Sequence, residues 1–222
     1  MAANAGVKPL KLDIGTKGDP FVVHASVLWD ENELVLVDTG LPGQLELIRE
    51  AMERESLPFD KLTKIIITHQ DRDHIGSLPE LVQAFDGKIQ VLAHEVGVPY
   101  LQGEIPLVKS GTFAKPVKVD VKLQDGVVLP IAGGVKVIFT PGHTPDHMCL
   151  YHEPSRTLIT GDALTADNGV LMPPNPKVTP DWEGAIHSLS KLLDYDIATA
   201  ITYHGGVCTD NIRERLTEIS AS

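Results

Sequence analysis

Residues 68–76 read Thr-His-Gln-Asp-Arg-Asp-His-Ile-Gly, and they place four residues with metal-ligating side chains within six positions. These four are His69, Asp71, Asp73 and His74. They directly follow the apolar, β-branched run 64–68, which is typical of a buried strand. A strand that ends in imidazoles and carboxylates puts them on one loop at the edge of a sheet, where a ligand can reach them. The stretch therefore predicts a metal site rather than a polar surface loop.

Three further strand-like runs each lead into a loop that carries one such side chain beside glycine or proline. The runs are 135–140, 156–160 and 198–203, and the side chains that follow them are His143, Asp162 and His204. Glycine in these loops permits tight turns and close backbone approach to a buried ion. If the four strand ends meet, they supply enough ligands for two metal ions that share a bridging carboxylate.

The set of motifs resembles the metallo-β-lactamase superfamily, whose hallmark is His-x-His-x-Asp-His followed by a lone histidine, a lone aspartate and a last histidine. The flanking motifs agree as well: Val37-Asp-Thr-Gly40, Thr140-Pro-Gly-His-Thr-Pro145 and Thr160-Gly-Asp162. The resemblance covers about residues 20–207. It implies an αββα sandwich, in which two mixed β-sheets carry helices on their outer faces. Patterning alone indicates only a mixed α/β protein, and the length suits a single domain over residues 1–222.

One position departs from the family pattern, because Asp71 stands where the family has its second histidine. By resemblance, one metal site consists of His69, Asp71 and His143 and a second consists of Asp73, His74 and His204, with Asp162 as the bridge. The extra carboxylate neutralises the cluster, which weakens its Lewis acidity, and an oxygen ligand favours harder metals. We therefore expect two divalent ions per chain, zinc first, with manganese or iron as alternatives. In the competing interpretation Asp71 only hydrogen-bonds a neighbouring ligand, and its site is weak or empty.

The resemblance implies a binuclear hydrolase that attacks an ester-like bond with a hydroxide held between the metals. Lactones and thioesters are the first expected substrates, and phosphodiesters rank behind them. Asp73 stands where the family's aspartate both ligates a metal and passes a proton to the leaving group, so it is the candidate catalytic residue. Two alternatives stay open: a di-iron redox protein that resembles the flavodiiron core, which carries a glutamate at the Asp71 position, and a non-catalytic metal-binding module. A chain of 222 residues is short for the first, since flavodiiron proteins normally need a flavin domain.

For four polar residues outside the motif, the sequence predicts either a supporting hydrogen bond or exposure to solvent. Asp38 follows a strand and is a candidate hydrogen-bond partner for a ligating imidazole, although it could equally cap the turn at residues 39–40. His147, four residues after His143, is a second candidate for such a bond. His152 and His187 are expected to be solvated.

Composition argues against several partner classes. With 19 basic and 30 acidic residues the chain has a net charge of −11, and no basic cluster could follow a phosphate backbone, so nucleic acid is not expected as a partner. No apolar run could span a membrane, and the first ten residues lack the apolar core of a signal peptide. Cys149 and Cys208 lie in or beside apolar stretches, so buried free thiols are expected. We expect a cytoplasmic enzyme that acts on a small molecule, and a homodimer is compatible with this picture.

Most of the chain can be assigned to expected elements. Strands are expected at residues 10–14, 21–29, 34–38, 64–68, 89–93, 117–123, 127–129, 135–140, 148–152, 157–160 and 198–203. Helices are expected at residues 44–55, 78–85, 182–193 and 211–219, the third with Thr179 or Asp181 as its N-cap.

Residues 98–116 and 164–180 fit neither class. Long irregular segments of this kind often form binding loops, so they either wall an apolar substrate cleft or pack against a second subunit. The apolar side chains available for such a cleft are Tyr100, Leu101, Phe113, Leu171 and Met172.

Overall fold

The structure is a computed structural model that describes residues 5–16 and 18–221. The first four residues, which belong to the segment expected to contain no signal peptide, lie outside this range. One six-stranded sheet has the spatial order β1 (Gly6–Asp13), β2 (Val22–Trp29), β3 (Leu34–Val37), β4 (Lys64–Ile67), β5 (Gln90–His94) and β6 (Val121–Leu123). The other has the order β14 (Gly206–Cys208), β13 (Thr199–Thr202), β10 (Thr157–Ile159), β9 (Met148–His152), β8 (Val135–Phe139) and β7 (Val128–Leu129). A separate hairpin consists of β11 (Thr165–Asp167) and β12 (Val170–Met172).

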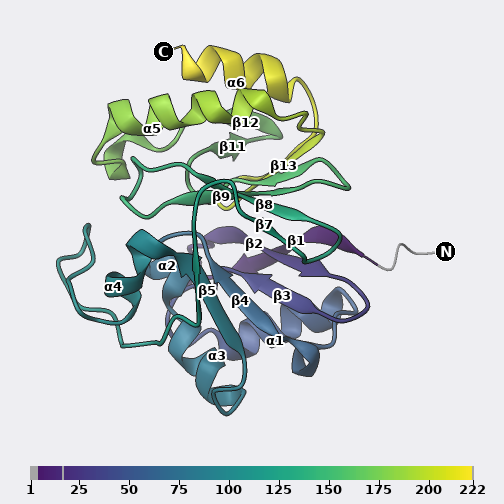
Figure 1. Ribbon diagram of the computed structural model, residues 1–222, viewed down its shortest axis with the longest axis vertical. Helices are drawn as coiled ribbons and strands as arrows, with labels where there is room; N and C mark the ends of the chain where they lie inside the picture. Colours follow the sequence, from purple (N-terminus) through teal and green to yellow (C-terminus); the bar gives the residue numbers. More distant parts are fainter. Residues whose placement is uncertain (1–4, 17, 222) are drawn as a thin grey trace.

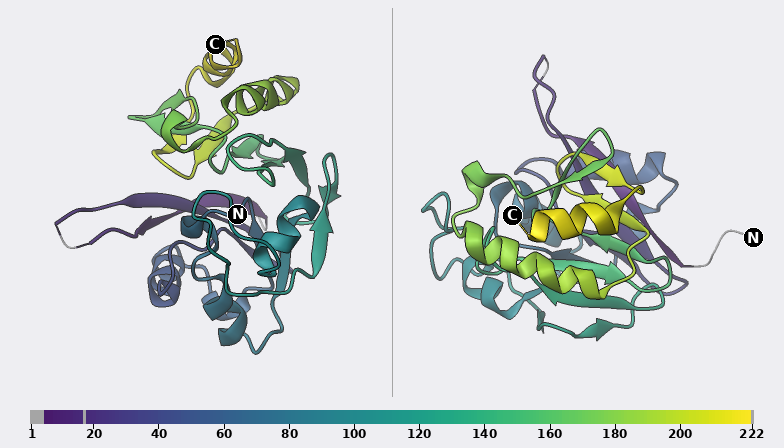
Figure 2. Two further views of the ribbon diagram at one scale, coloured as in Figure 1. Left: turned by 90° about the vertical axis from the view of Figure 1, so that its left-hand side faces the viewer. Right: turned by 90° about the horizontal axis from the view of Figure 1, so that it is seen from above.

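The two large sheets lie face to face between layers of helices. The α-helices are α1 (Leu45–Arg54), α2 (Arg72–Ile75), α3 (Leu78–Ala84), α4 (Val98–Leu101), α5 (Trp182–Leu189) and α6 (Ile212–Ser220). The 3-10 helices are η1 (Phe59–Lys61), η2 (Glu95–Gly97), η3 (Pro176–Val178) and η4 (Ser190–Asp194). In Figure 1, α1 and α3 lie below the first sheet and α5 and α6 lie above the second. Seen from above in Figure 2, α5 and α6 run across the second sheet, so the layers follow the predicted αββα order.

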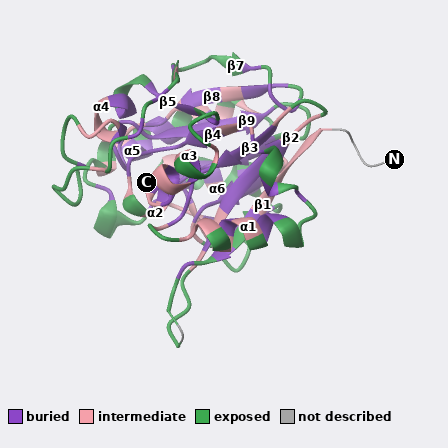
Figure 3. Ribbon diagram, turned by 90° about the horizontal axis from the view of Figure 1, so that it is seen from below, coloured by how far each residue is buried: buried purple, intermediate pink, exposed green. Residues whose placement is uncertain are grey.

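The central strands β3 and β4 are almost continuously apolar because they face two cores. In β4, Ile65 and Ile67 pack toward the helices, whereas Ile66 packs toward the second sheet. Successive side chains of a strand point to opposite faces, so a strand buried on both faces has no polar side. Burial of each isoleucine contributes about 1.5–3 kcal/mol. Figure 3 shows the result from below: buried central strands lie beside exposed helix faces, and residues 15–16 and 18–20 of the long β1–β2 hairpin are exposed.

The topology of the second sheet brings three predicted ligand loops to one edge. β8 and β10 each pair antiparallel with β9, and β13 pairs parallel with β10. Consequently β8, β10 and β13 run in the same direction, and the loops that carry His143, Asp162 and His204 leave the sheet on the same side. A bridge between Val23 and His204 joins this edge to β2 of the first sheet.

The expected elements are present, with local differences. The expected helix 182–193 is α-helical to Leu189 and continues as η4, and its N-cap is Asp181, whose Oδ1 accepts a hydrogen bond from the Gly184 amide at 2.9 Å. The expected strand 117–123 is shorter, because only β6 pairs with β5. The two segments left unassigned contain α4, the β11–β12 hairpin and η3, so they are not wholly irregular.

Burial confirms some expectations and corrects one. His152 was expected to be solvated and is buried, with its Nδ1 bonded to the Ser155 hydroxyl at 2.6 Å and its Nε2 bonded to the Ala132 carbonyl at 2.8 Å. His187 is exposed, and Cys149 and Cys208 are buried free thiols, as expected. Within residues 5–16 and 18–221, no helix is long and apolar enough to cross a membrane.

Candidate metal centre

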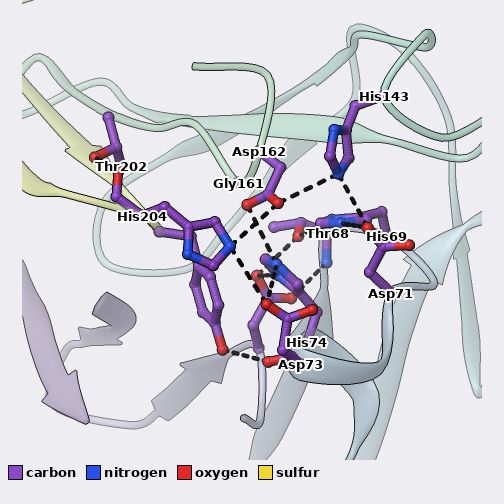
Figure 4. A network of polar contacts seen from close by, with 12 residues as sticks. Thr68, His69, Asp71, Asp73, His74, His143, Gly161, Asp162, Thr202 and His204 are labelled. Carbon is purple, nitrogen blue, oxygen red and sulfur yellow. Dashed lines mark hydrogen bonds and ion pairs between the residues drawn. The ribbon is translucent and has the colours of Figure 1, made fainter. Parts of the chain in front are cut away.

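Four strand ends bring the seven predicted ligands together (Figure 4). After β4 the chain turns into α2, so that His69 and Asp71 lie on the loop, and Asp73 and His74 lie on the short helix. We call His69, Asp71 and His143 the first ligand group. We call Asp73, His74 and His204 the second ligand group. The structure brings all seven residues together, and their role as metal ligands is a prediction.

Asp162 lies between the two ligand groups. Its Oδ1 is 3.2 Å from His74 Nε2 in the second group, and its Oδ2 is 3.2 Å from His143 Nε2 in the first. The same Oδ2 is 3.3 Å from His204 Nε2. One carboxylate therefore faces both groups, which is the placement a bridging ligand needs.

The geometry of these side chains fits divalent metal ions. In the first group, Asp71 Oδ2 is 3.0 Å from His143 Nε2 and 3.3 Å from His69 Nε2. Tetrahedral bonds of about 2.0–2.1 Å hold ligand atoms about 3.3 Å apart. Moreover, His69 Nε2, His74 Nε2 and Asp162 Oδ1 are buried and form no hydrogen bond, although each lies 3.2–3.3 Å from another ligand atom. Burial of a polar atom without a hydrogen bond is costly, and metal coordination would remove that cost.

Asp38 holds His74 from behind, as one of the two interpretations predicted. Its carboxylate lies 2.9 Å from His74 Nδ1 and accepts hydrogen bonds from the amide and hydroxyl of Thr68 at 2.8 and 2.7 Å. The neighbouring turn is bonded instead by Thr39, whose amide and hydroxyl both donate to the His74 carbonyl. A carboxylate behind a ligating imidazole sets its tautomer and raises its basicity.

Other ligands are also oriented by fixed partners. His147 Nε2 accepts a hydrogen bond from the Asp162 amide at 3.0 Å, so His147 acts on the centre as predicted, through the backbone of Asp162. His143 Nδ1 lies 3.2 Å from the Thr179 hydroxyl, which directs Nε2 toward Asp71 and Asp162. Asp162 and His143 are therefore held in orientations suited to metal binding by the protein itself.

The carboxylates of the centre shift the pKa values of its histidines. Burial disfavours the charged ring of His74, but the charges of Asp162, Asp38 and Asp73 outweigh it and raise its pKa well above 6.5. Burial likewise opposes the charge on His204, yet its contacts with Asp162 and Asp73 raise its pKa to about 9. An imidazole must be deprotonated to bind a metal ion, so metal binding by these two histidines would release protons.

The ligand groups line a cavity of about 520 Å³. Both of the unassigned segments contribute to its walls. They supply Leu107, Lys109, Ser110, Thr165, Asn175 and Val178. On the other side, Phe21 stacks on the His204 ring with 5.5 Å between the ring centroids. Such a cavity suits a small molecule with an apolar part.

The apolar side chains expected to wall this cavity do not do so. Leu171 is fully buried in the core beneath α5 and α6. Leu101 and Phe113 line a second cavity of about 200 Å³, which shares Arg72 and Leu107 with the first. The sequence predicted that segments 98–116 and 164–180 line the cavity, but it did not predict which of their residues face it. The choice of residues depends on how the loops fold over α2 and α4.

Sequence reasoning also missed several residues at the centre: Phe21, Gln70, Arg72 and Lys109. The Lys109 ammonium contacts Asp71 Oδ2 and lies 2.6 Å from His143 Nε2. Two signals were available: a lysine in a segment already predicted to line the pocket, and an extra carboxylate at Asp71 that favours a nearby positive charge.

Comparison with known proteins supports the family resemblance that the sequence motifs indicated. Residues 18–204 match the model of the metallo-beta-lactamase superfamily. The chain is 32% identical to the probable metallo-hydrolase YflN of Bacillus subtilis, over 86% of this chain and 83% of that protein. It is 25% identical to an atrochrysone carboxyl ACP thioesterase of Pseudocercospora fijiensis, over 80% of this chain and 45% of that protein.

The solved structures agree with the fold. The metallo-beta-lactamase family protein TTHA1429 from Thermus thermophilus superposes with a TM-score of 0.70 at 24% identity, over 97% of this chain and 78% of that one. This match confirms the αββα architecture derived above. With the family match over most of its length, the chain belongs to the metallo-beta-lactamase superfamily.

Proposed function

We propose that the protein is a binuclear metallohydrolase that cleaves an ester-like bond in a small molecule, a lactone or thioester before a phosphodiester. One observation carries the proposal: Asp162 lies 3.2 Å from a histidine nitrogen of each ligand group. A carboxylate shared in this way suits two metal ions at bridging distance. Membership of a family of metallo-hydrolases supports hydrolysis as the reaction class.

The chain's own residues divide the work around the ions. When bound, two divalent ions supply a nucleophile derived from water at neutral pH and polarise the bond under attack. Asp73 faces the cavity from the second ligand group, with its Oδ2 3.3 Å from His204 Nε2. The family resemblance and this position support our proposal that Asp73 both binds a metal ion and passes a proton to the leaving group. Phe21, Leu107 and Val178 provide apolar wall that limits the access of water to the substrate.

The substrate class rests on the cavity and on charge. The net charge of −11 disfavours a nucleic-acid substrate, and the cavity of about 520 Å³ suits a small molecule. Two relatives are named thioesterases, which supports an acyl bond rather than a phosphoryl one.

Metal identity follows from the ligands. Each predicted ligand group contains two histidines, the nitrogen ligand that suits zinc, and we propose zinc on that ground. Asp71 adds an oxygen ligand and keeps manganese or iron as alternatives. It also keeps a di-iron redox protein as a second candidate, which requires about two iron ions per chain and a coloured, reducible centre.

The test combines metal content with hydrolysis. Protein purified without a metal-affinity tag is expected to contain about two zinc or manganese ions per chain. It is also expected to hydrolyse members of a panel of lactones and thioesters, with activity lost to a chelator and restored by the metal. The matched variants are His204→Ala, which removes a predicted ligand, and His187→Ala, which removes an exposed histidine outside the centre. One ion or none per chain after incubation with excess metal, or hydrolysis that survives complete metal removal, would contradict the proposal.

A further inference from the structure

Lys109 contacts two of the three donor atoms of the first ligand group. Its ammonium is paired with Asp71 Oδ2 and lies 2.6 Å from His143 Nε2. The Nδ1 of His143 faces Thr179, so the nitrogen that Lys109 reaches is the one directed into the centre. A metal ion bound by the first ligand group needs these same two atoms. His143 Nε2 has a single lone pair, so the ammonium and a metal ion cannot use it together. At Asp71 Oδ2, the two cations would repel each other.

The backbone around Lys109 is anchored, so this contact is not that of a free surface lysine. The Val108 amide donates to Gln70 Oε1 at 2.7 Å, and Gln70 Nε2 donates to the buried Asp146 at 3.0 Å. Gln70 lies between two of the predicted ligands in the chain, and it thus joins the Lys109 loop to the loop that follows β4.

The turn that carries Lys109 is also closed on itself. The Leu107 amide donates to the Thr112 carbonyl and the Gly111 amide donates to the Leu107 carbonyl, both at 2.8 Å, and the Leu107 side chain is buried. The Lys109 Nζ group is consequently held within reach of the first ligand group.

Charge explains why a lysine belongs here. Asp71 adds a carboxylate that a histidine ligand would not carry, and the Lys109 ammonium supplies one matching positive charge. The pair is sheltered, with 22% of the lysine side chain and 14% of the aspartate side chain exposed, so its attraction is less screened than that of a surface pair. Among the described residues, no lysine or arginine contacts a ligand atom of the second group.

We propose that Lys109 is a built-in competitor for the first metal position: it binds Asp71 and His143 while that position is empty and must leave before a metal ion enters. This inference rests on the proposed binuclear centre. It follows that the two positions load unequally. The second ligand group with Asp162 binds its ion first, and the first ligand group binds more weakly because each ion must displace the ammonium.

The experiment is a zinc titration of the metal-stripped protein against a chromophoric chelator. Wild-type protein is expected to bind two ions in separate steps, and His143→Ala identifies the first-group step by losing it. In Lys109→Met, which keeps the chain length but not the charge, the weaker step is expected to tighten by about tenfold, the size of a charge-assisted hydrogen bond. The tighter step is expected to change by less than about threefold. Lys115→Met removes the same charge from an exposed position of the same segment and is expected to match wild type.

A second measurement needs no variant. Amine acetylation of wild-type protein, read by peptide mass spectrometry, is expected to leave Lys109 protected with one equivalent of zinc and reactive with two. Lys115 serves as the internal reference. An unchanged or weaker first-group step in Lys109→Met, or Lys109 labelling that ignores the second equivalent, would overturn the inference.

The outcomes separate this inference from the proposed function. If both zinc-binding steps are unchanged in Lys109→Met and the enzyme is active, Lys109 is not a competitor and the proposed hydrolase function stands. A tightened step in Lys109→Met without hydrolysis of any panel substrate supports the competitor and counts against the hydrolase.

Discussion

The two ligand groups use similar side chains but are supported from opposite sides. In the second group, His74 is held from the protein interior by the buried carboxylate of Asp38. In the first group, the corresponding partner of His143 is the neutral hydroxyl of Thr179. The first group is instead balanced from the cavity side, where Lys109 meets Asp71.

This difference means that the electrostatic support of the second group is permanent, whereas that of the first group depends on where Lys109 lies. A buried carboxylate behind an imidazole is always present and raises its basicity. A lysine on the cavity side can be displaced, so the electrostatic support of the first group changes with what the cavity holds. The predictions below test whether the two groups differ in this way, beginning with the residue they share.

Loss of the shared carboxylate is expected to have the largest effect. Asp162→Asn keeps the side-chain size but removes the charge that faces both ligand groups, so both are expected to lose affinity. Hydrolysis should fall by roughly 1,000-fold, because stabilisation by the metals is worth several kcal/mol. Elemental analysis and steady-state kinetics check this. Full zinc content with normal hydrolysis would show that Asp162 is not a shared ligand.

Removal of the supporting partners separates the two groups. Asp38→Asn is expected to weaken zinc binding at the second group by about 10–100-fold, as is usual for loss of a carboxylate behind a ligating histidine. Asparagine tolerates the positive φ of 64° at this position, so the backbone is preserved. Thr179→Val removes a neutral partner and is expected to weaken only the first-group step, by less than about tenfold. Equal effects of the two variants on both steps would show that the groups do not differ.

The metal-free protein should lose stability as pH rises above neutrality. The pKa of His204 is raised from 6.5 to about 9, so the folded state keeps a proton that the unfolded state releases. This stabilisation is complete below about pH 6.5 and disappears as pH rises through 9. Thermal unfolding in a chelator at about pH 6.5 and pH 8 should therefore show a falling midpoint. His204→Gln should flatten the trend, and a rise in the wild-type midpoint over this range would contradict it.

The smallest expected effect concerns the cavity wall of the second group. Phe21 stacks on the ring of His204, and Phe21→Ala is expected to lower kcat/KM by about 2–10-fold, the energy of an aromatic pair. Zinc content should stay at the wild-type level because Phe21 supplies no ligand atom. Loss of zinc in this variant would mean that the stack holds His204 in place rather than shaping the cavity.

Much of the centre was predictable because its chemistry is local in sequence. The four ligands after β4 lie within one short run, and each other ligand follows an apolar strand and lies beside glycine or proline. Since strand identity can be read from apolar patterning, the positions of the loops were predictable too. The burial of His152 was not, because its partner Ala132 reaches it only through the pairing of β8 with β9.

By itself, the sequence determined the fold family, the seven candidate ligands and the departure at Asp71. Only the tertiary structure decided what surrounds them. Lys109 meets Asp71 across 38 positions of sequence, and Phe21 meets His204 from the opposite end of the chain. The physical reason is that a ligand motif depends on residue type and spacing along one strand and loop, whereas a cavity wall depends on which distant loops pack together.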